Sequence, residues 1–280
     1  MAERDPLAEP LWLRVLLIAL AVLIMAALVV LPLLMVLGAA FGDGFAAWWG
    51  ALNQPDARDA LKLTLLTAAI VIPVNAVFGT LMAWAVTRFE FRGKRALLAL
   101  IDLPFAVSPV VAGLCLVLLF STTHGWFASL LQAWDIRILF ARPGIVLATL
   151  FITFPFVVRE LIPLMQQQGH DEELAARSLG AGAWTMFRRV TLPNIKWGLL
   201  YGVLLCNARA MGEFGAVSVV SGHIRGMTNT MPLHVEILFN EYQFVASFAV
   251  ALLLCLLAIV TLVLKALLEA LQPAHQRLAH

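Results

Sequence analysis

Two residues of opposite charge, Arg209 and Glu213, lie in a stretch between Lys196 and about Ser221 that carries no other charge. Their spacing places them on one face of a helix. An Arg fork suits a tetrahedral oxyanion, and a nearby carboxylate would weaken the attraction enough for the anion to leave. The alternative, which we favour, is a buried ion pair that holds this helix against a neighbour, because a paired Arg is poorly available to a ligand. Ser218 could donate a hydrogen bond to an anion in transit, although helix packing is the commoner role of such a serine.

The polar segment 168–195 carries a second pattern. Asp171, Glu172 and Glu173 suit the first turn of a helix, because the helix dipole favours negative charge there. Gly180 and Gly182 allow that helix to end and the chain to turn.

The residues after this turn predict a second short amphipathic helix. Trp184 and Phe187 are apolar, two adjacent arginines follow, and Pro193 is expected to break the chain before the next long helix. Such a helix pair could lie on lipid headgroups or could dock a protein, and patterning alone leaves both interpretations open.

The composition indicates which elements position these residues. Apolar residues make up 62% of the 280-residue chain and charged residues only 13%, which excludes a typical soluble enzyme and a disordered protein. The net charge is +2 and the basic residues are scattered, so nucleic-acid binding is not expected. The three cysteines lie in apolar sequence without a CxxC pair and the six histidines are dispersed. We therefore expect buried apolar cysteines, no disulfide and no metal site.

Stretches long enough to cross a bilayer, which requires about 20 mainly apolar residues, recur along the chain. They predict an all-α polytopic membrane protein with six spanning helices, near residues 14–37, 62–87, 96–121, 143–166, 197–220 and 244–268. Most of the 19 basic residues then fall on the side that holds both termini, so we expect cytoplasmic termini and external segments near 38–61, 122–142 and 221–243. Gly198 and Gly202 form a small-xxx-small pair that predicts a close helix contact.

Asp102, Pro104 and Pro109 lie in the first half of the third predicted helix. Prolines at membrane depth leave carbonyls unpaired, which is tolerable only against protein or water. A bent helix that lines a pathway is one interpretation. An N-terminal capping acid at Asp102 is the other, and it is the one we favour.

The 168–195 segment resembles the EAA loop of permease subunits in bacterial ABC importers. The matching positions are Ala175, Ala176, Gly180, Val190, Leu192 and Pro193. In that family the loop forms coupling helices that dock on the ATP-hydrolysing subunit. The resemblance implies a type I importer permease (MetI-like) fold, with residues 1–280 as a single permease domain. The glutamate of the family pattern falls at Leu174, and Glu172 and Glu173 are the candidates to replace it.

Segments 102–113 and 207–222 resemble the sulfate permease branch of this family. Arg225 and the segment 233–238 resemble the CysW type of that branch more than its CysT type. The resemblance implies a bacterial inner-membrane subunit for sulfate, and for thiosulfate as well. It also implies a CysT-like permease partner, a CysA-like ATPase dimer that binds the ATP and Mg, and a periplasmic binding protein. This chain would then be no enzyme and carry no cofactor.

Two rival functions are considered beside this one. The 209–215 element is also similar in molybdate permeases, so import of molybdate or another tetrahedral oxyanion is the alternative. A stand-alone secondary transporter is less favoured, because Glu213 is the only central intramembrane acid available for ion coupling.

Overall fold

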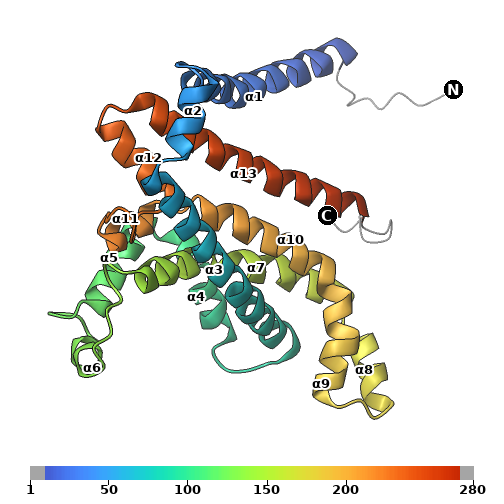
Figure 1. Ribbon diagram of the computed structural model, residues 1–280. Helices are drawn as coiled ribbons and strands as arrows, with labels where there is room; N and C mark the ends of the chain where they lie inside the picture. The colour runs from blue at the N-terminus through green and yellow to red at the C-terminus, as the bar shows by residue number, and fades with distance from the viewer. Residues whose placement is uncertain (1–9, 272–280) are drawn as a thin grey trace.

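The computed structural model describes residues 10–271, and within them every regular element is helical (Figure 1). The elements in chain order are α1 Leu11–Ala40, α2 Phe45–Leu52, α3 Pro55–Arg88, α4 Lys94–Ala106, α5 Pro109–Phe120, α6 Ala128–Ala133, α7 Arg142–Gln168, α8 Asp171–Ser178, α9 Ala183–Met186, the π-helical turn η1 Phe187–Thr191, α10 Leu192–Met211, α11 Gly215–Ser221, α12 Met231–Asn240 and α13 Phe244–Leu271.

Four helices are each long and apolar enough to cross a membrane, namely α1, α3, α7 and α13. Two bent pairs raise the number of candidate spans in residues 10–271 to as many as six. The helix α4 meets α5 at a bend of 113°, and the continuous helix Ala183–Met211 meets α11 at 52°. Counting each bent pair as one span gives all six predicted spans, with those near 96–121 and 197–220 broken rather than continuous.

The chain ends of the described part lie on the same side as the α8–α9 loop. In Figure 1, α1 begins and α13 ends toward the right, where α8 and α9 also lie. The helices α2, α6 and α12 lie toward the left, with α6 well below the other two. Long apolar helices run between these two groups of segments.

The centre of the fold is formed by α3, α7 and α10, which approach closely through glycines. A Cβ atom on Gly79 of α3 would lie 2.7 Å from the Val157 side chain of α7. A Cβ on Gly202 of α10 would lie 3.1 Å from the Val157 Cα, and one on Gly198 would lie 2.5 Å from the Leu164 side chain. The predicted small-xxx-small contact is thus confirmed, and its partner is α7.

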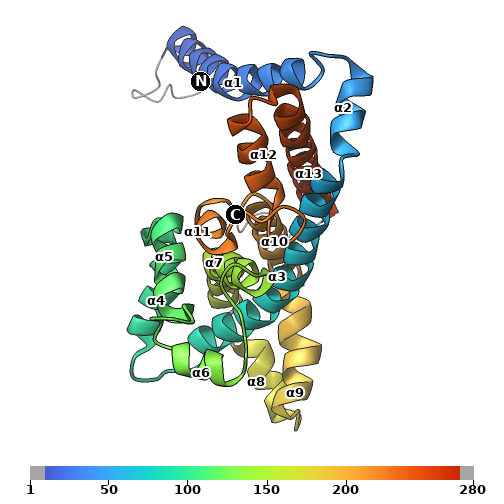
Figure 2. The ribbon, with the colours of Figure 1, turned by 60° about the vertical axis from the view of Figure 1, so that its left-hand side comes forward.

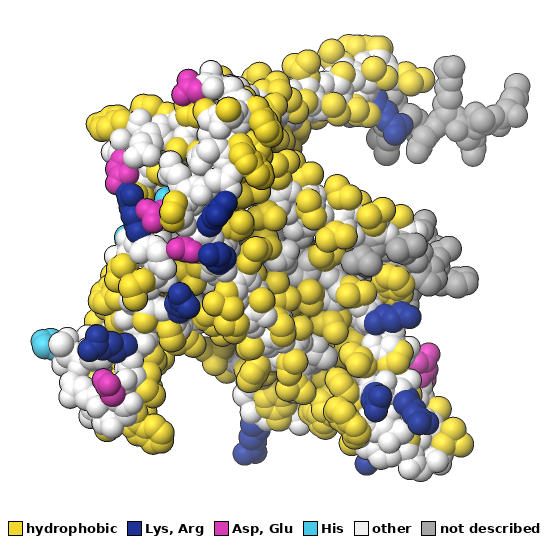
Figure 3. Space-filling model, viewed as in Figure 1, with side chains coloured by type: hydrophobic (Ala, Val, Ile, Leu, Met, Phe, Trp, Pro, Cys, Tyr) yellow, Lys and Arg dark blue, Asp and Glu magenta, His cyan; other side chains and the backbone are white. Residues whose placement is uncertain are grey.

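The outer surface is largely apolar. Figure 3 shows hydrophobic side chains over most of one face, with charged groups gathered toward two sides of it. The helix α1 contacts α13 and leaves its apolar side chains exposed. Of the three cysteines predicted to be buried, only Cys206 is buried, whereas Cys255 is half-buried and Cys115 is exposed on α5, so the prediction is wrong for Cys115. A bilayer accepts an exposed apolar side chain where water would not, and sequence alone does not separate the two cases.

Pro193 does not end a helix, and this corrects a second prediction. The chain runs as one helix from Ala183 to Met211, with Pro193 in its interior. The preceding residues Phe187–Thr191 form the π-helical turn, in which the hydrogen bonds reach one residue further back than in an α-helix. We attribute the tolerance of the proline to this local rearrangement of hydrogen bonds around its missing N–H.

Candidate functional site

The α8–α9 loop begins as the sequence predicts. Asp171, Glu172 and Glu173 occupy the first turn of α8, where the helix dipole favours acids. Gly180 follows α8 with a φ of 84°, a left-handed conformation that glycine adopts without strain. Gly182 then begins the second helix in an extended conformation, with a φ of −69°. The two glycines therefore produce the turn expected of them.

The inner face of α8 is polar and is bound to the rest of the chain. Glu173 is 8% exposed, and its Oε2 atom lies 2.8 Å from Nε of Arg88 at the end of α3. The Thr191 hydroxyl donates a hydrogen bond of 2.6 Å to the other Glu173 oxygen. Glu172 accepts a hydrogen bond from the Asn194 amide. Both glutamates that were candidates to replace the carboxylate of the family pattern at Leu174 therefore make contacts within the chain.

The outer face of the loop is apolar. Leu174 is 58% exposed, Leu179 88% and Trp184 71%. The Trp184 ring stacks on Phe187 at 6.0 Å between centroids, and Phe187 contacts Trp84 of α3 at 5.7 Å. Ala175 is exposed as well, and Ala176 is half-buried. An exposed apolar surface of this kind, bordered by charge, is typical of a protein interface or a lipid-facing surface.

Arg209 and Glu213 form an ion pair, with 2.6 Å between Nη1 and Oε2. Glu213 is 2% exposed, whereas the Arg209 side chain retains 32% of its exposure. The second carboxylate oxygen of Glu213 accepts the backbone N–H of Ala216 in the first turn of α11, at 2.9 Å. Glu213 therefore joins the end of α10 to the start of α11 across the break between them.

Ser218 uses its hydroxyl within its own helix. The hydroxyl donates a 2.9 Å hydrogen bond to the backbone carbonyl of Gly215. In this conformation the hydrogen is occupied, and Ser218 offers only its oxygen to a neighbour.

The two helix breaks meet. A Cβ on Gly215 of α11 would lie 2.8 Å from the Pro109 side chain of α5, and one on Gly113 would lie 2.9 Å from the Ala216 carbonyl oxygen. Figure 2 shows α5 standing beside α11. Ser108, at the N-terminus of α5, is exposed and makes no side-chain capping bond. Because exposed helix ends are not tolerated against lipid, this region must face water or another protein.

Asp102 does not cap a helix, which corrects the interpretation that we favoured. It lies within α4, and its carboxylate accepts a 2.8 Å hydrogen bond from Nε of Arg159 on α7. The bend of the other interpretation is found at the break before Pro109, whereas the pathway that such a helix would line stays a prediction. A residue that precedes proline is driven to an extended conformation, and Ser108 has a ψ of 136°.

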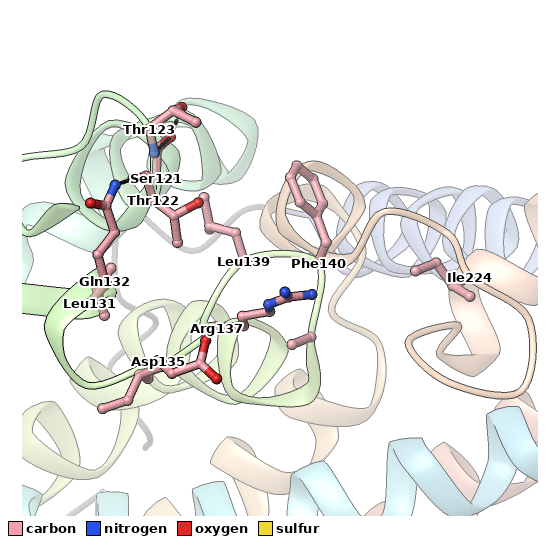
Figure 4. Close-up of a pocket in the computed structure, with 12 residues that line it drawn as sticks. Ser121, Thr122, Thr123, Leu131, Gln132, Asp135, Arg137, Leu139, Phe140 and Ile224 are labelled. Atoms are coloured by element: carbon pink, nitrogen blue, oxygen red, sulfur yellow. Dashed lines mark hydrogen bonds between the residues drawn. The ribbon is translucent and has the colours of Figure 1, made fainter.

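A cavity of about 670 Å³ opens on the side away from α8. Its lining comes from the end of α5, from α6, from the segment before α7 and from Ile224 after α11 (Figure 4). Arg137 and Asp135 both contribute to it, so its lining combines a cation with an anion. Arg225, the residue after Ile224, pairs with Glu241 and lies 3.5 Å from Asp56. The segment before α12 is thereby tied to the end of α12 and to the first turn of α3.

Sequence reasoning missed two groups of contacts. It treated Arg88 only as a charge that marks a membrane boundary, and it gave Asn75 no role. Asn75 is 2% exposed and donates to Thr153 Oγ1 at 2.7 Å and to Cys206 Sγ at 3.4 Å, so it joins α3, α7 and α10. A polar residue inside an apolar span was the available signal, but its partners lie 78 and 131 residues away.

Known proteins resemble this chain in sequence and in fold. Its residues 75–274 match the family described as "Binding-protein-dependent transport system inner membrane component". The chain is 51% identical to the sulfate transport system permease protein CysW of Synechocystis over 256 residues, covering 91% of this chain and 92% of that one. It is 52% identical to CysW of Escherichia coli K12 over 263 residues, covering 94% and 90%, and 40% identical to CysT of that organism over 207 residues, covering 74% of each chain.

Among solved structures, a chain of a bacterial alginate ABC transporter in complex with an alginate-bound periplasmic protein has the same fold. The TM-score is 0.73 at 18% identity, with 94% of this chain and 96% of that chain covered. A second structure, of a bacterial ABC transporter for alginate import, gives 0.76 at 17% identity, with 92% and 94% covered. With six candidate spans, two of them broken, and a loop that presents an apolar surface, the chain belongs to the family of inner-membrane components of binding-protein-dependent transport systems.

Proposed function

We propose that this chain is the CysW-type permease subunit of an ABC importer that carries sulfate, and also thiosulfate, across the bacterial inner membrane. The observation that carries the proposal is the identity of about half of the residues, over nearly the whole chain, to permeases named for sulfate transport. The lower identity to CysT supports the CysW type. The names of these relatives favour sulfate over molybdate, the alternative left open by the sequence.

The partners are inferred from surfaces of this chain that need another protein beside them. A helix break with an exposed N-terminus at membrane depth needs a second protein or water beside it, and a CysT-like permease in a heterodimer meets that need. The apolar outer face of the α8–α9 loop fits a CysA-like ATPase, which binds ATP and Mg and supplies the energy. A periplasmic protein that binds sulfate or thiosulfate would deliver the anion at the opposite side, where α2, α6 and α12 lie. Both chain termini are then cytoplasmic.

In mechanism, closure of the ATPase dimer on ATP would move the loop 168–195. Because α9, η1 and α10 form one continuous helix, a displacement of the loop reaches membrane depth without an intervening hinge. The break at 212–214 then lets α11 change its angle to α10, and α5 moves with α11 because the two are in close contact through Gly113 and Gly215. We assign the Arg209–Glu213 pair to holding this break, since Glu213 is buried between both helices.

The test is reconstitution of this chain with a CysT-like permease and the ATPase in proteoliposomes. Uptake of labelled sulfate is expected only with ATP and a loaded binding protein. Excess thiosulfate is expected to compete, and molybdate to compete weakly. Sulfate uptake by this chain alone, without an ATPase, would show that it is not an importer subunit of this kind.

Docking of the ATPase is tested with two matched tryptophans. Trp184 and Trp134 are each 71% exposed, on opposite sides of the membrane in the proposed topology. Trp184→Ser is expected to reduce copurification of the ATPase, while Trp134→Ser leaves it unchanged. Equal copurification with both variants would remove the loop surface from the docking site.

A further inference from the structure

Arg88 holds three elements together at the end of the membrane-spanning part. It is the last residue of α3, and only 8% of its side chain is exposed. Its Nε atom lies 2.8 Å from the Glu173 carboxylate of α8, and its Nη1 atom donates to the Met165 carbonyl of α7 at 3.2 Å. One guanidinium group thus links α3, α7 and α8.

Glu173 is the only residue of α8 that is buried. The other residues of this helix are exposed or half-buried, so α8 is not held by an apolar core of its own. The second oxygen of Glu173 accepts the Thr191 hydroxyl of η1, which brings a fourth element into the same contact. The attachment of α8 to the membrane helices is therefore mainly an ion pair and its hydrogen bonds.

The space under α8 supports this description. A polar cavity of about 270 Å³ is lined by Arg88, Glu173, Thr191 and Asn194, among others. The helix is therefore not closely packed on the chain beneath it. The Arg88–Glu173 ion pair and the hydrogen bonds with the Met165 carbonyl and the Thr191 hydroxyl hold its angle, because a guanidinium group that contacts a carboxylate and a carbonyl at once permits few orientations.

We propose that Arg88 is a positioning residue, which makes α8 move together with α3 and α7 when the ATPase displaces it. The proposal rests on the proposed function, which supplies the ATPase. Without the Arg88–Glu173 contact, α8 still presents Leu174 and Leu179 outward and still docks, but its displacement no longer reaches the membrane helices in full. ATP is then hydrolysed with little transport.

The test uses Arg88→Gln and the double variant Arg88→Gln/Glu173→Gln in the complete reconstituted complex. The double variant leaves no unpaired buried charge, so it provides a folded protein in case the single variant is unstable. Arg92→Gln, an exposed arginine four residues further on, is the matched control. Two quantities are measured, namely copurification of the ATPase and the amount of sulfate transported per ATP hydrolysed.

Sulfate transported per ATP is expected to fall roughly tenfold in both Arg88 variants, a change typical of lost coupling between two sites. Copurification of the ATPase is expected to stay at the level of the Arg92→Gln control, and Arg88→Lys is expected to recover part of the ratio. An unchanged ratio in the double variant would overturn the proposal. So would loss of copurification, which would make the pair a part of the docking surface. Failure of the proposed function would appear differently, as no transport by the unmodified complex.

Discussion

The Arg209–Glu213 pair allows a quantitative test, because its two members differ in exposure. Glu213 is 2% exposed, forms an ion pair with the Arg209 guanidinium and accepts the Ala216 N–H, whereas the Arg209 side chain is 32% exposed. Replacing Arg209 with Gln therefore leaves a buried carboxylate with one neutral donor. Replacing Glu213 with Gln leaves a cation that water still reaches.

The magnitudes follow from this asymmetry. Leaving one member of a buried ion pair uncompensated costs about 3–5 kcal/mol, and water near Arg209 places Arg209→Gln at about 3 kcal/mol of lost unfolding free energy. Glu213→Gln keeps an oxygen for the Ala216 N–H and loses a charged hydrogen bond, which costs about 1.5 kcal/mol. The double variant removes the stranded carboxylate, so it is expected to be about 1.5 kcal/mol more stable than Arg209→Gln.

The assay combines denaturant unfolding of the purified complex with sulfate uptake in proteoliposomes. We expect the double variant to recover both stability and uptake relative to Arg209→Gln, because the pair acts by holding the break between α10 and α11. A double variant no more stable than Arg209→Gln would refute the stranded-carboxylate reasoning. A stable double variant without uptake would instead assign Arg209 to the anion pathway, the interpretation that we did not favour.

Three further predictions concern single residues. A Cβ added by Gly180→Ala meets no atom within 4 Å, so the variant only strains the left-handed backbone, at a cost of about 1–2 kcal/mol in the stability of the loop. We expect faster proteolysis of the loop and weaker copurification of the ATPase. An unchanged proteolysis rate would contradict this prediction. Gly113→Val forces a side chain against the Ala216 carbonyl 2.9 Å away and is expected to cost about 1–3 kcal/mol in thermal unfolding, whereas Gly38→Val, with nothing within 4 Å, serves as the control. Burial lowers the pKa of His234, in α12, below its usual 6.5. The folded state then binds fewer protons than the unfolded state between that lowered pKa and about 6.5, so stability rises with pH through this window and is full above it. Unfolding temperatures measured at about pH 5 and pH 7.5 are expected to differ less in His234→Gln, and an equal difference would exclude this histidine as the source.

The positions of the membrane helices could be predicted because they depend on local composition. Each of the six spans was located from its apolar run. The breaks were harder to predict. Pro109 signals one of them, but not its angle of 113° or the close glycine contact of α5 with α11, which lies about a hundred residues further along the chain. The break after Gly212 follows no proline, and an apolar pattern does not distinguish it from a continuous helix.

The candidate site shows the same difference between local features, which could be predicted, and contacts between distant residues, which could not. The acids of α8 and the turn at Gly180 were predictable, since they follow from the helix dipole and from backbone conformation. The partners of those acids were not. Glu173 looks like any first-turn acid in sequence, and only the fold brings Arg88 to it from the end of α3. Tertiary packing decides which distant residues pair, and neither the periodicity nor the spacing of residues in the sequence predicts that packing.

The placement of the buried charges bears on how such a chain can move. Inside a bilayer, apolar contacts between helices have little to gain over contacts with lipid, so close glycine packing and polar links determine which helices move together. The helices α3, α7 and α10 are joined by glycine contacts and by Asn75, which we expect to keep them together. The two buried ion pairs lie elsewhere, where α8 meets α3 and where α10 meets α11. Charge is therefore placed where α8 is attached to α3 and at the break between α10 and α11, and at both places an ion pair can hold an angle that apolar packing would leave free.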